Sequence, residues 1–232
     1  MFFEVPVLVT ERLRLREFRG SDLADYAALN ADPEVLRYLP SAGREPWDLG
    51  RTYRHLAFLL GHWHLAGCGV WAVEQKGTGS FIGMVGFSEP AGWPGCELSW
   101  KLVRRWWGHG YATEAARAAL DHAFSFLRKD RVISLIHPEN RASIRVAERI
   151  GETLQGAITH FGFAMLCYGI DRESGANSAW KPSGTGESSH SRARGPAATS
   201  SALNTAKALS PRSASKSWQM TAPASRPAGS VA

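Results

Sequence analysis

Hydrophobic and polar positions alternate with two different periods along the first 173 residues. Between Thr10 and Phe18, leucines alternate with arginines, which predicts a half-buried strand. From residue 110 to 128, apolar side chains recur at helical spacing and predict a long amphipathic helix. The other predicted elements are helices opening at Ser21 and Pro33, a helix over 48–64, strands over 70–74, 81–87 and 96–103, a strand over 132–136, a helix over 140–150 and a last strand over 161–170.

The order of these elements predicts a mixed α/β (α+β) fold. Short turns join the three strands between residues 70 and 103, so they are expected to form an antiparallel meander. The later strands are separated by helices, and crossovers of this βαβ kind produce parallel pairs. We therefore predict one mixed sheet within a single domain over residues 1–173.

The last 59 residues have a different composition, because 41 of them are Ser, Ala, Gly, Pro or Thr. Such a segment buries too little apolar surface to offset its ordering entropy, so residues 174–232 are predicted to be a disordered basic tail. The tail carries all of the net charge of +6, since residues 1–173 contain 20 basic and 20 acidic residues. A neutral body argues against specific nucleic-acid or membrane binding. The tail is either a weak electrostatic tether or a solvated extension.

Cysteine spacing and hydropathy suggest a cytoplasmic protein. Cys68, Cys96 and Cys167 are widely spaced and form no CxxC pair, as expected for reduced thiols. The chain start lacks the pattern of an export signal, and no uninterrupted apolar stretch is long enough for a membrane span. His62 and His64 face apart on a helix with no third ligand nearby in the sequence, so no metal is expected.

The sequence Arg105-Trp-Trp-Gly108-His-Gly110 stands where a strand ends and the long helix begins. Glycines at such a junction let successive N–H groups point to one place, where the helix N-terminus adds partial positive charge. This predicts a pyrophosphate cradle, with a plain glycine turn as the alternative. A dinucleotide fingerprint would need glycine at Thr113, and a P-loop would need Gly-Lys-Ser/Thr, so neither applies.

This Arg-x-x-Gly-x-Gly pattern resembles the acyl-CoA signature of the GNAT N-acetyltransferase superfamily. Residues 10–16, 97–103 and 140–151 also resemble, in family order, segments of the branch that acetylates ribosomal-protein N-terminal amines. The resemblance covers residues 8–172. It implies acetyl transfer from acetyl-CoA, as co-substrate, to a primary amine by direct attack in a ternary complex. The acceptor would be a protein N-terminus or a small molecule of the aminoglycoside or polyamine type.

The same resemblance implies where the co-substrate binds. In the family, acetyl-CoA lies where the fourth and fifth strands splay apart, so unpaired backbone groups near Leu102 and Val103 would bind the pantetheine. Asn140 would cap its helix and contact the co-substrate amides. The pyrophosphate would lie on the backbone N–H groups of a loop that includes Arg105, Gly108, His109, Gly110, Tyr111 and Ala112.

Three side chains are candidates for proton transfer. Glu97 lies in the strand that leads into the cleft and would accept the amine proton; alternatively, it is an ordinary strand-face carboxylate paired with a base. Ser143 or Tyr168 would donate a proton to the leaving thiolate. Ser143 also stands three residues after Asn140, which is ordinary helix-capping chemistry. Glu152 departs from the family pattern, which has an aromatic residue or Met there.

Two matters stay open at this point. A noncatalytic acyl-CoA-binding module would keep the glycine loop without turnover. The acceptor depends on the variable helices around residues 21–65 and on the loop over residues 89–95, and the chain could be a monomer or a homodimer.

Overall fold

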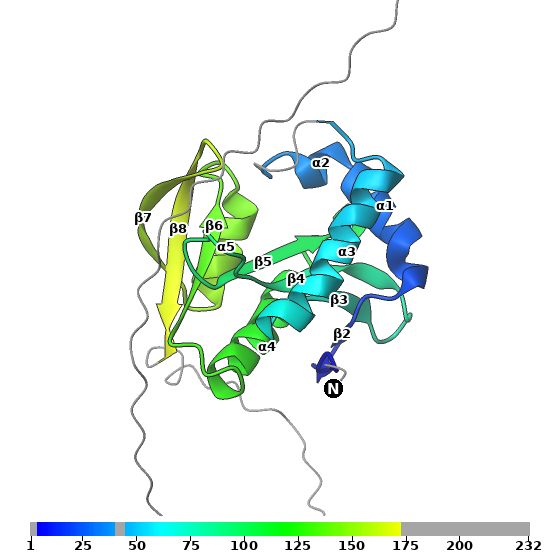
Figure 1. Ribbon diagram of the computed structural model, residues 1–232, viewed down its shortest axis with the longest axis horizontal. Coiled ribbons are helices and arrows are strands. Elements are labelled where there is room, and N and C mark those ends of the chain that lie inside the picture. Colours follow the sequence, from blue (N-terminus) through cyan, green and yellow to red (C-terminus); the bar gives the residue numbers. More distant parts are fainter. Residues whose placement is uncertain (1–3, 40–44, 173–232) are drawn as a thin grey trace, which may run out of the picture. The chain divides into compact units, whose positions relative to one another are not determined.

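The computed structural model describes residues 4–39 and 45–172, which form one eight-stranded sheet with helices on both faces (Figure 1). The predicted tail lies outside the described residues. The strands are β1 (Leu8–Val9), β2 (Leu13–Arg16), β3 (Val70–Gln75), β4 (Phe81–Ser88), β5 (Glu97–Leu102), β6 (Arg131–Ile136), β7 (Thr153–His160) and β8 (Phe163–Asp171). The helices are α1 (Leu23–Ala31), α2 (Pro33–Leu36), α3 (Leu49–Ala66), α4 (Tyr111–Ser125) and α5 (Arg141–Arg149), with 3-10 turns η1 (Gly20–Asp22) and η3 (Arg104–Trp106).

The sheet is mixed, as predicted, with the order β1-β2-β3-β4-β5-β6-β8-β7. Strands β1 to β5 pair antiparallel, and β5 and β6 form the parallel pair on either side of α4. Strands β6 and β7 both run antiparallel to β8. They are therefore parallel to each other, so the connection through α5 is a second crossover, with β8 inserted between its strands.

Two strands were missing from the sequence prediction. The short β1 pairs with β2 through a turn that the prediction had included in a single strand over residues 10–18. The residues of β7 are almost all exposed, and their sequence lacks a clean alternation of apolar and polar positions. This segment is a strand because it pairs with β8. A strand that is exposed on both faces has no alternation of apolar and polar residues, so its sequence does not predict it.

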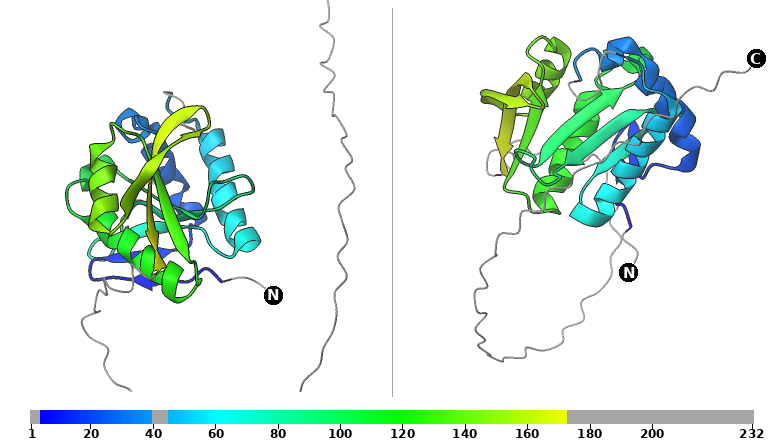
Figure 2. Two further views of the ribbon diagram at one scale, coloured as in Figure 1. Left: turned by 90° about the vertical axis from the view of Figure 1, so that its left-hand side faces the viewer. Right: turned by 45° about the horizontal axis from the view of Figure 1, so that its top comes forward.

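Helices cover both faces of the central strands (Figure 2). Alternate residues of these strands pack against different helical layers. Val70 and Ala72 of β3 belong to a cluster with residues of α1 and α3. Trp71 and Val73 belong to the other cluster, with the buried alanines of α4. Four of these alanines are fully buried, and their small side chains let the helix axis approach the sheet closely: Ala115, Ala116, Ala119 and Ala123.

The start of α4 is fixed to the β1–β2 turn by Glu114. Its carboxylate accepts hydrogen bonds from Thr10 Oγ1 at 2.6 Å and from the Arg12 N–H at 2.9 Å, and it pairs with the Arg12 guanidinium at 2.6 Å. Burial alone would raise the pKa of Glu114, but these hydrogen bonds outweigh it, and the pKa lies below its ordinary value. Glu114 is thus an anchor as well as a favourable charge at the helix N-terminus.

Strand β5 is paired unequally on its two sides. Its register with β4 runs from Glu97 opposite Ser88 to Leu102 opposite Gly83. Its register with β6 consists of one position, Glu97 opposite Ile133. The sequence predicted that two neighbouring strands of the sheet splay apart. The structure shows this splay between β5 and β6, and it begins directly after Glu97.

Gly83 allows the close approach of β4 to β5. Its φ is +148°, and a Cβ added there would lie 2.2 Å from the Lys101 carbonyl oxygen. Gly83→Ala should therefore lower the free energy of unfolding by at least about 2 kcal/mol in urea denaturation.

Gly61 of α3 provides the control for that measurement. A Cβ there meets no atom within 4 Å and φ is helical, so Gly61→Ala should leave stability unchanged or raise it by up to about 1 kcal/mol. Equal stability of Gly83→Ala and wild type would contradict the packing argument.

Candidate active site

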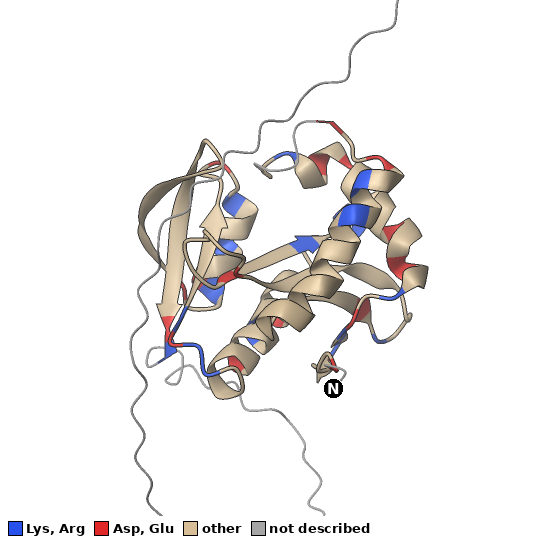
Figure 3. Ribbon diagram, viewed as in Figure 1, with Lys and Arg blue, Asp and Glu red and all other residues tan. Residues whose placement is uncertain are grey.

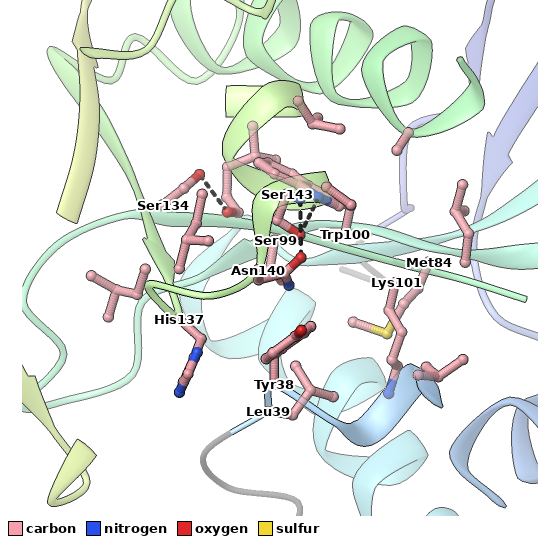
Figure 4. Close-up of a pocket in the computed structure, with 18 of the residues that line it drawn as sticks. Tyr38, Leu39, Met84, Ser99, Trp100, Lys101, Ser134, His137, Asn140 and Ser143 are labelled. Carbon is pink, nitrogen blue, oxygen red and sulfur yellow. Dashed lines mark hydrogen bonds between the residues drawn. The ribbon is translucent and has the colours of Figure 1, made fainter. Parts of the chain in front are cut away.

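A cavity of about 490 Å³ opens along β5, where this strand parts from β6 (Figure 4). All six residues of β5 line it. The other walls come from α2 and the segment after it, from α3, from the loop before α4, from α5, and from the turn between β7 and β8.

Side chains replace the backbone ladder at the point where the strands part. After the pairing of Glu97 with Ile133, the next rung of a parallel ladder would join the Leu135 N–H to the Leu98 carbonyl. Instead, Ser134 Oγ lies 2.8 Å from the Leu98 carbonyl oxygen. The Leu135 N–H donates to the Glu97 carboxylate. The Leu135 N–H, which has no partner in the interrupted ladder, therefore binds the Glu97 carboxylate instead.

The environment of Glu97 changes its acidity. Trp93 Nε1 donates to its Oε2 at 2.5 Å, and no ion pair of the described residues includes this carboxylate. Burial raises the pKa of Glu97 to about 7, although the hydrogen bonds from Trp93 and Leu135 act in the opposite direction. Such a group exchanges a proton near neutral pH, as a general base for an amine should. The alternative of a carboxylate paired with a basic side chain does not hold.

The side chains on the two faces of β5 line different halves of the cavity. Leu98 and Leu102 pack with α4, whereas Lys101 Nζ donates to Asn30 of α1. Because strand residues alternate, Glu97, Ser99 and Lys101 share the side that faces α1 and α3.

Trp100 connects β5 to α5. Its Nε1 donates to Ser143 Oγ at 3.3 Å, and the Ser143 N–H donates to Asn140 Oδ1 at 3.1 Å (Figure 4). Asn140 is thus the N-cap of α5, as expected. Both suggested roles of Ser143 are compatible, because its N–H completes the cap while its hydroxyl lines the cavity.

The backbone of β5 that faces the opening lies at Trp100 and at the Leu102 N–H, so the expected position includes Leu102 but not the Val103 N–H. The Val103 N–H donates to the Ile82 carbonyl at 2.9 Å, and the Leu102 carbonyl accepts from Trp107 Nε1 at 2.8 Å. The carbonyls of Leu98 and Leu102 both face away from β4, so Trp100 between them directs its own N–H and C=O into the opening.

The glycine loop borders the other end of the cavity. Gly108 and Gly110 both have φ of +80°, and α4 begins directly afterwards at Tyr111. The Arg12 guanidinium donates to the His109 carbonyl at 3.0 Å and so ties the loop to the β1–β2 turn. Six of the nine expected co-substrate residues line the cavity: Leu102, Gly108, Gly110, Tyr111, Ala112 and Asn140.

Four predicted site residues do not line the cavity. Val103 and Arg105 border a separate hollow of about 70 Å³. The His109 side chain is exposed, with Nδ1 2.8 Å from the Trp107 carbonyl. Tyr168 of β8 is buried in a cluster with Ile136 of β6 and with Ile144 and Ala147 of α5. Of the two candidate proton donors, Ser143 is the one that faces the cavity.

Ser134 and Glu152 form a buried pair that the sequence did not reveal. Glu152 is 2% exposed, and its Oε1 lies 3.0 Å from Ser134 Oγ, while its Oε2 has no partner. A hydroxyl has one proton, and Ser134 lies within reach of two acceptors, the Leu98 carbonyl and Glu152. Both hydrogen bonds form if Ser134 donates to Leu98 and a protonated Glu152 donates to Ser134. Burial, together with the negative charge of Glu97, raises the pKa of Glu152 to about 8.

The remaining sequence expectations concern metals, membranes and thiols. Within residues 4–39 and 45–172, no group of three His, Cys, Asp or Glu side chains is placed to hold a metal ion. In the same residues, no helix combines the length and the apolar character needed to cross a membrane. The three cysteines are free.

Comparison with known proteins identifies the family. Residues 12–153 match the family model described as the acetyltransferase (GNAT) domain. The chain therefore belongs to the GNAT acetyltransferases and is an N-acetyltransferase by family, which confirms the resemblance drawn from its motifs. Members of this family transfer an acyl group from acetyl-CoA to an amine.

Individual relatives agree with this assignment. The uncharacterized protein YkkB of Bacillus subtilis is 37% identical over 147 residues, which are 62% of this chain and 83% of YkkB. An acetyltransferase from Agrobacterium tumefaciens has a TM-score of 0.64 and 34% identity, covering 73% of this chain and 96% of its own. RimL, a ribosomal-protein α-N-acetyltransferase in complex with coenzyme A, has a TM-score of 0.62 over 72% of this chain and 98% of its own. At 16% identity, RimL shows the shared fold alone.

The buried acid leads to a test by thermal unfolding. The pKa of Glu152 rises from an ordinary 4.5 to about 8 on folding, so over this range the folded protein retains a proton that the unfolded chain has released. The wild type therefore loses stability as the pH rises through this window. Glu152→Gln keeps a donor for Ser134 without titrating, so its Tm should exceed that of the wild type increasingly from pH 5 to pH 8, by about 3 °C or more at the upper end.

Glu148→Gln is the matched control, because Glu148 is an exposed glutamate of α5. Its Tm difference from the wild type should not change with pH. A Tm gap for Glu152→Gln that stays constant from pH 5 to pH 8 would show that Glu152 is ionised in the folded protein.

Proposed function

We propose that this protein transfers an acetyl group from acetyl-CoA to a primary amine by direct attack within a ternary complex. The observation that carries the proposal is Glu97, a carboxylate without an ion-pair partner among the described residues and with a pKa of about 7, at the apex of the cavity. The glycine loop and Ser143 border the same cavity. One cavity therefore brings together the residues that we assign as proton acceptor, proton donor and phosphate cradle.

The described residues fit acetyl-CoA along the α4 and α5 side of β5. The N–H and C=O groups of Trp100 are available for the pantetheine amides and for the thioester oxygen. The backbone around Gly108 and Gly110 is available for the pyrophosphate. Arg145 and Arg149 of α5 line the cavity and would add positive charge for the phosphates. Figure 3 marks the Lys and Arg positions of the ribbon in blue.

Glu97 and Ser143 would move the protons of the reaction from opposite sides of β5. The bound ammonium gives one proton to Glu97, and its nitrogen then attacks the carbonyl carbon, forming the C–N bond as the C–S bond breaks. The nitrogen releases its second proton to water, and water returns a proton to Ser143 after Ser143 has protonated the sulfur. The Ser143 hydroxyl accepts a hydrogen bond from Trp100 Nε1, so its own proton is available for the departing sulfur. Most of the rate would come from alignment of the reactants, since no covalent enzyme intermediate is needed.

The phosphate cradle is tested by replacing both loop glycines. Gly108→Val together with Gly110→Val should weaken acetyl-CoA binding at least about tenfold in calorimetry, because valine disfavours the φ of +80° and crowds the backbone N–H groups. Gly79→Val is the control: Gly79 has φ of +68° in the β3–β4 turn, so it shares the backbone penalty away from the cavity. Unchanged affinity in a folded double variant would refute the cradle.

The proton acceptor is tested through the pH dependence of the rate. A base with a pKa of about 7 is active when ionised, so kcat/KM for an amine should rise with pH through 7. Glu97→Gln should lower kcat by about 10²-fold to 10⁴-fold and weaken that rise, with little effect on acetyl-CoA affinity.

Glu11→Gln, at an exposed glutamate, should behave as the wild type. Full activity of Glu97→Gln would reject Glu97 as the base. If the wild type binds acetyl-CoA but releases no CoA with any amine tested, the protein is a noncatalytic acyl-CoA-binding module.

A further inference from the structure

The face of β5 toward α1 and α3 carries two opposite charges. Glu97 and Lys101 are four residues apart, with Ser99 between them, and all three line the cavity. Four residues of strand separate the two Cα atoms by about 13 Å, too far for the side chains to form an ion pair with each other. In Figure 4 the Lys101 side chain extends away from Asn140 and Ser143, toward the helices on the other side of the cavity.

Lys101 has no counter-ion in the described part of the chain. Its Nζ donates to Asn30 Oδ1 at 2.5 Å, and none of the ion pairs includes it. An ammonium has three donors, so two of them are available to a ligand. Lys101 is 8% exposed, and burial lowers its pKa to about 7.

Buried polar and aromatic groups surround the Lys101 ammonium, and two of them, Asn30 and Tyr26, do not line the cavity. Asn30 is fully buried, and its Nδ2 has no hydrogen-bond partner. The rings of Tyr26 and Trp47 lie 5.2 Å and 5.1 Å from Nζ. His55 bonds to the Tyr26 hydroxyl at 2.7 Å, and burial, followed by the nearby positive charges, lowers its pKa to about 4, so it is neutral at pH 7. A buried ammonium among such groups is costly unless an anion accompanies it.

We propose that the amine acceptor also carries a carboxylate, and that this carboxylate binds Lys101 while the amine lies near Glu97. The inference rests on the proposed acetyl transfer and narrows its substrate class. The order of charges along β5 is complementary to such a molecule, because the substrate ammonium meets the Glu97 carboxylate and the substrate carboxylate meets Lys101. Trp47 and Phe58 line the cavity and would pack against the connecting carbons.

The same chemistry is found in two kinds of acceptor, which matched pairs distinguish. The first pair is 6-aminohexanoate and 6-aminohexanamide. The second is a short peptide amide beginning Ser-Glu and its counterpart beginning Ser-Gln. With acetyl-CoA, kcat/KM from CoA thiol release should favour the carboxylate member of at least one pair by about tenfold or more, as expected for a charge-assisted hydrogen bond.

The assignment to Lys101 is tested by two substitutions. Lys101→Met removes the charge at similar length, and the ratio of kcat/KM for acid over amide should fall to about 1. Lys101→Arg keeps the charge and should retain a preference for the acid. Lys76→Met is the control, because Lys76 Nζ donates to the Thr10 carbonyl outside the cavity, and its ratio should equal that of the wild type.

A binding measurement separates this inference from the proposed function. Calorimetric titration of the CoA-saturated protein with each acceptor pair reports affinity without turnover. Tighter binding of the acid by the wild type, lost in Lys101→Met, supports the carboxylate site even if no acetyl transfer is detected. Equal affinities and equal rates for acid and amide in both pairs would overturn it while leaving acetyl transfer intact. An acid preference that persists in Lys101→Met would also overturn the assignment.

Discussion

The site depends on one constraint, the pairing of β5 with β6 at a single position. If the parallel ladder continued past Glu97 and Ile133, the Leu135 N–H would bond to the Leu98 carbonyl and the cleft would close. Side-chain groups take both places, Ser134 at the carbonyl and the Glu97 carboxylate at the N–H. The interruption thus opens the cavity, frees the backbone of β5 and supplies a hydrogen bond to the candidate base.

Burial of ionisable groups around this opening follows from the same arrangement. Glu97, Lys101 and Glu152 lie on or beside β5 without ion-pair partners among the described residues, and burial shifts each pKa toward the neutral form. Each unpaired buried group lowers the stability of the fold, and the packing of the core does not require such a group. Such groups are characteristic of sites where a ligand or a proton transfer completes the environment. Glu152 is explained differently, because in its neutral form it can donate to Ser134 and so support the position where β5 and β6 part.

Rigid anchors hold the two sides of the cavity in place. On the α4 side, Glu114 joins the first turn of the helix to Thr10 and Arg12, and Arg12 also contacts the glycine loop through the His109 carbonyl. On the α5 side, Asn140 caps the helix and Trp100 bonds to Ser143. Both anchors join segments that are far apart in the sequence, so the geometry of the cavity depends on the whole domain.

The sequence by itself determined the mixed sheet, the long helices and the glycine loop, because amphipathic period, turn residues and helix-opening glycines are local properties of the chain. It also indicated Glu97, Ser143 and Asn140. Tertiary structure alone decided that Tyr168 of β8 packs against α5 and that Trp100 turns its backbone N–H and C=O into the opening. It likewise made a strand of β7 and placed Lys101 without a counter-ion among residues 4–39 and 45–172. These features depend on which partner each residue meets across the sheet, and hydrophobic periodicity carries no information about that partner.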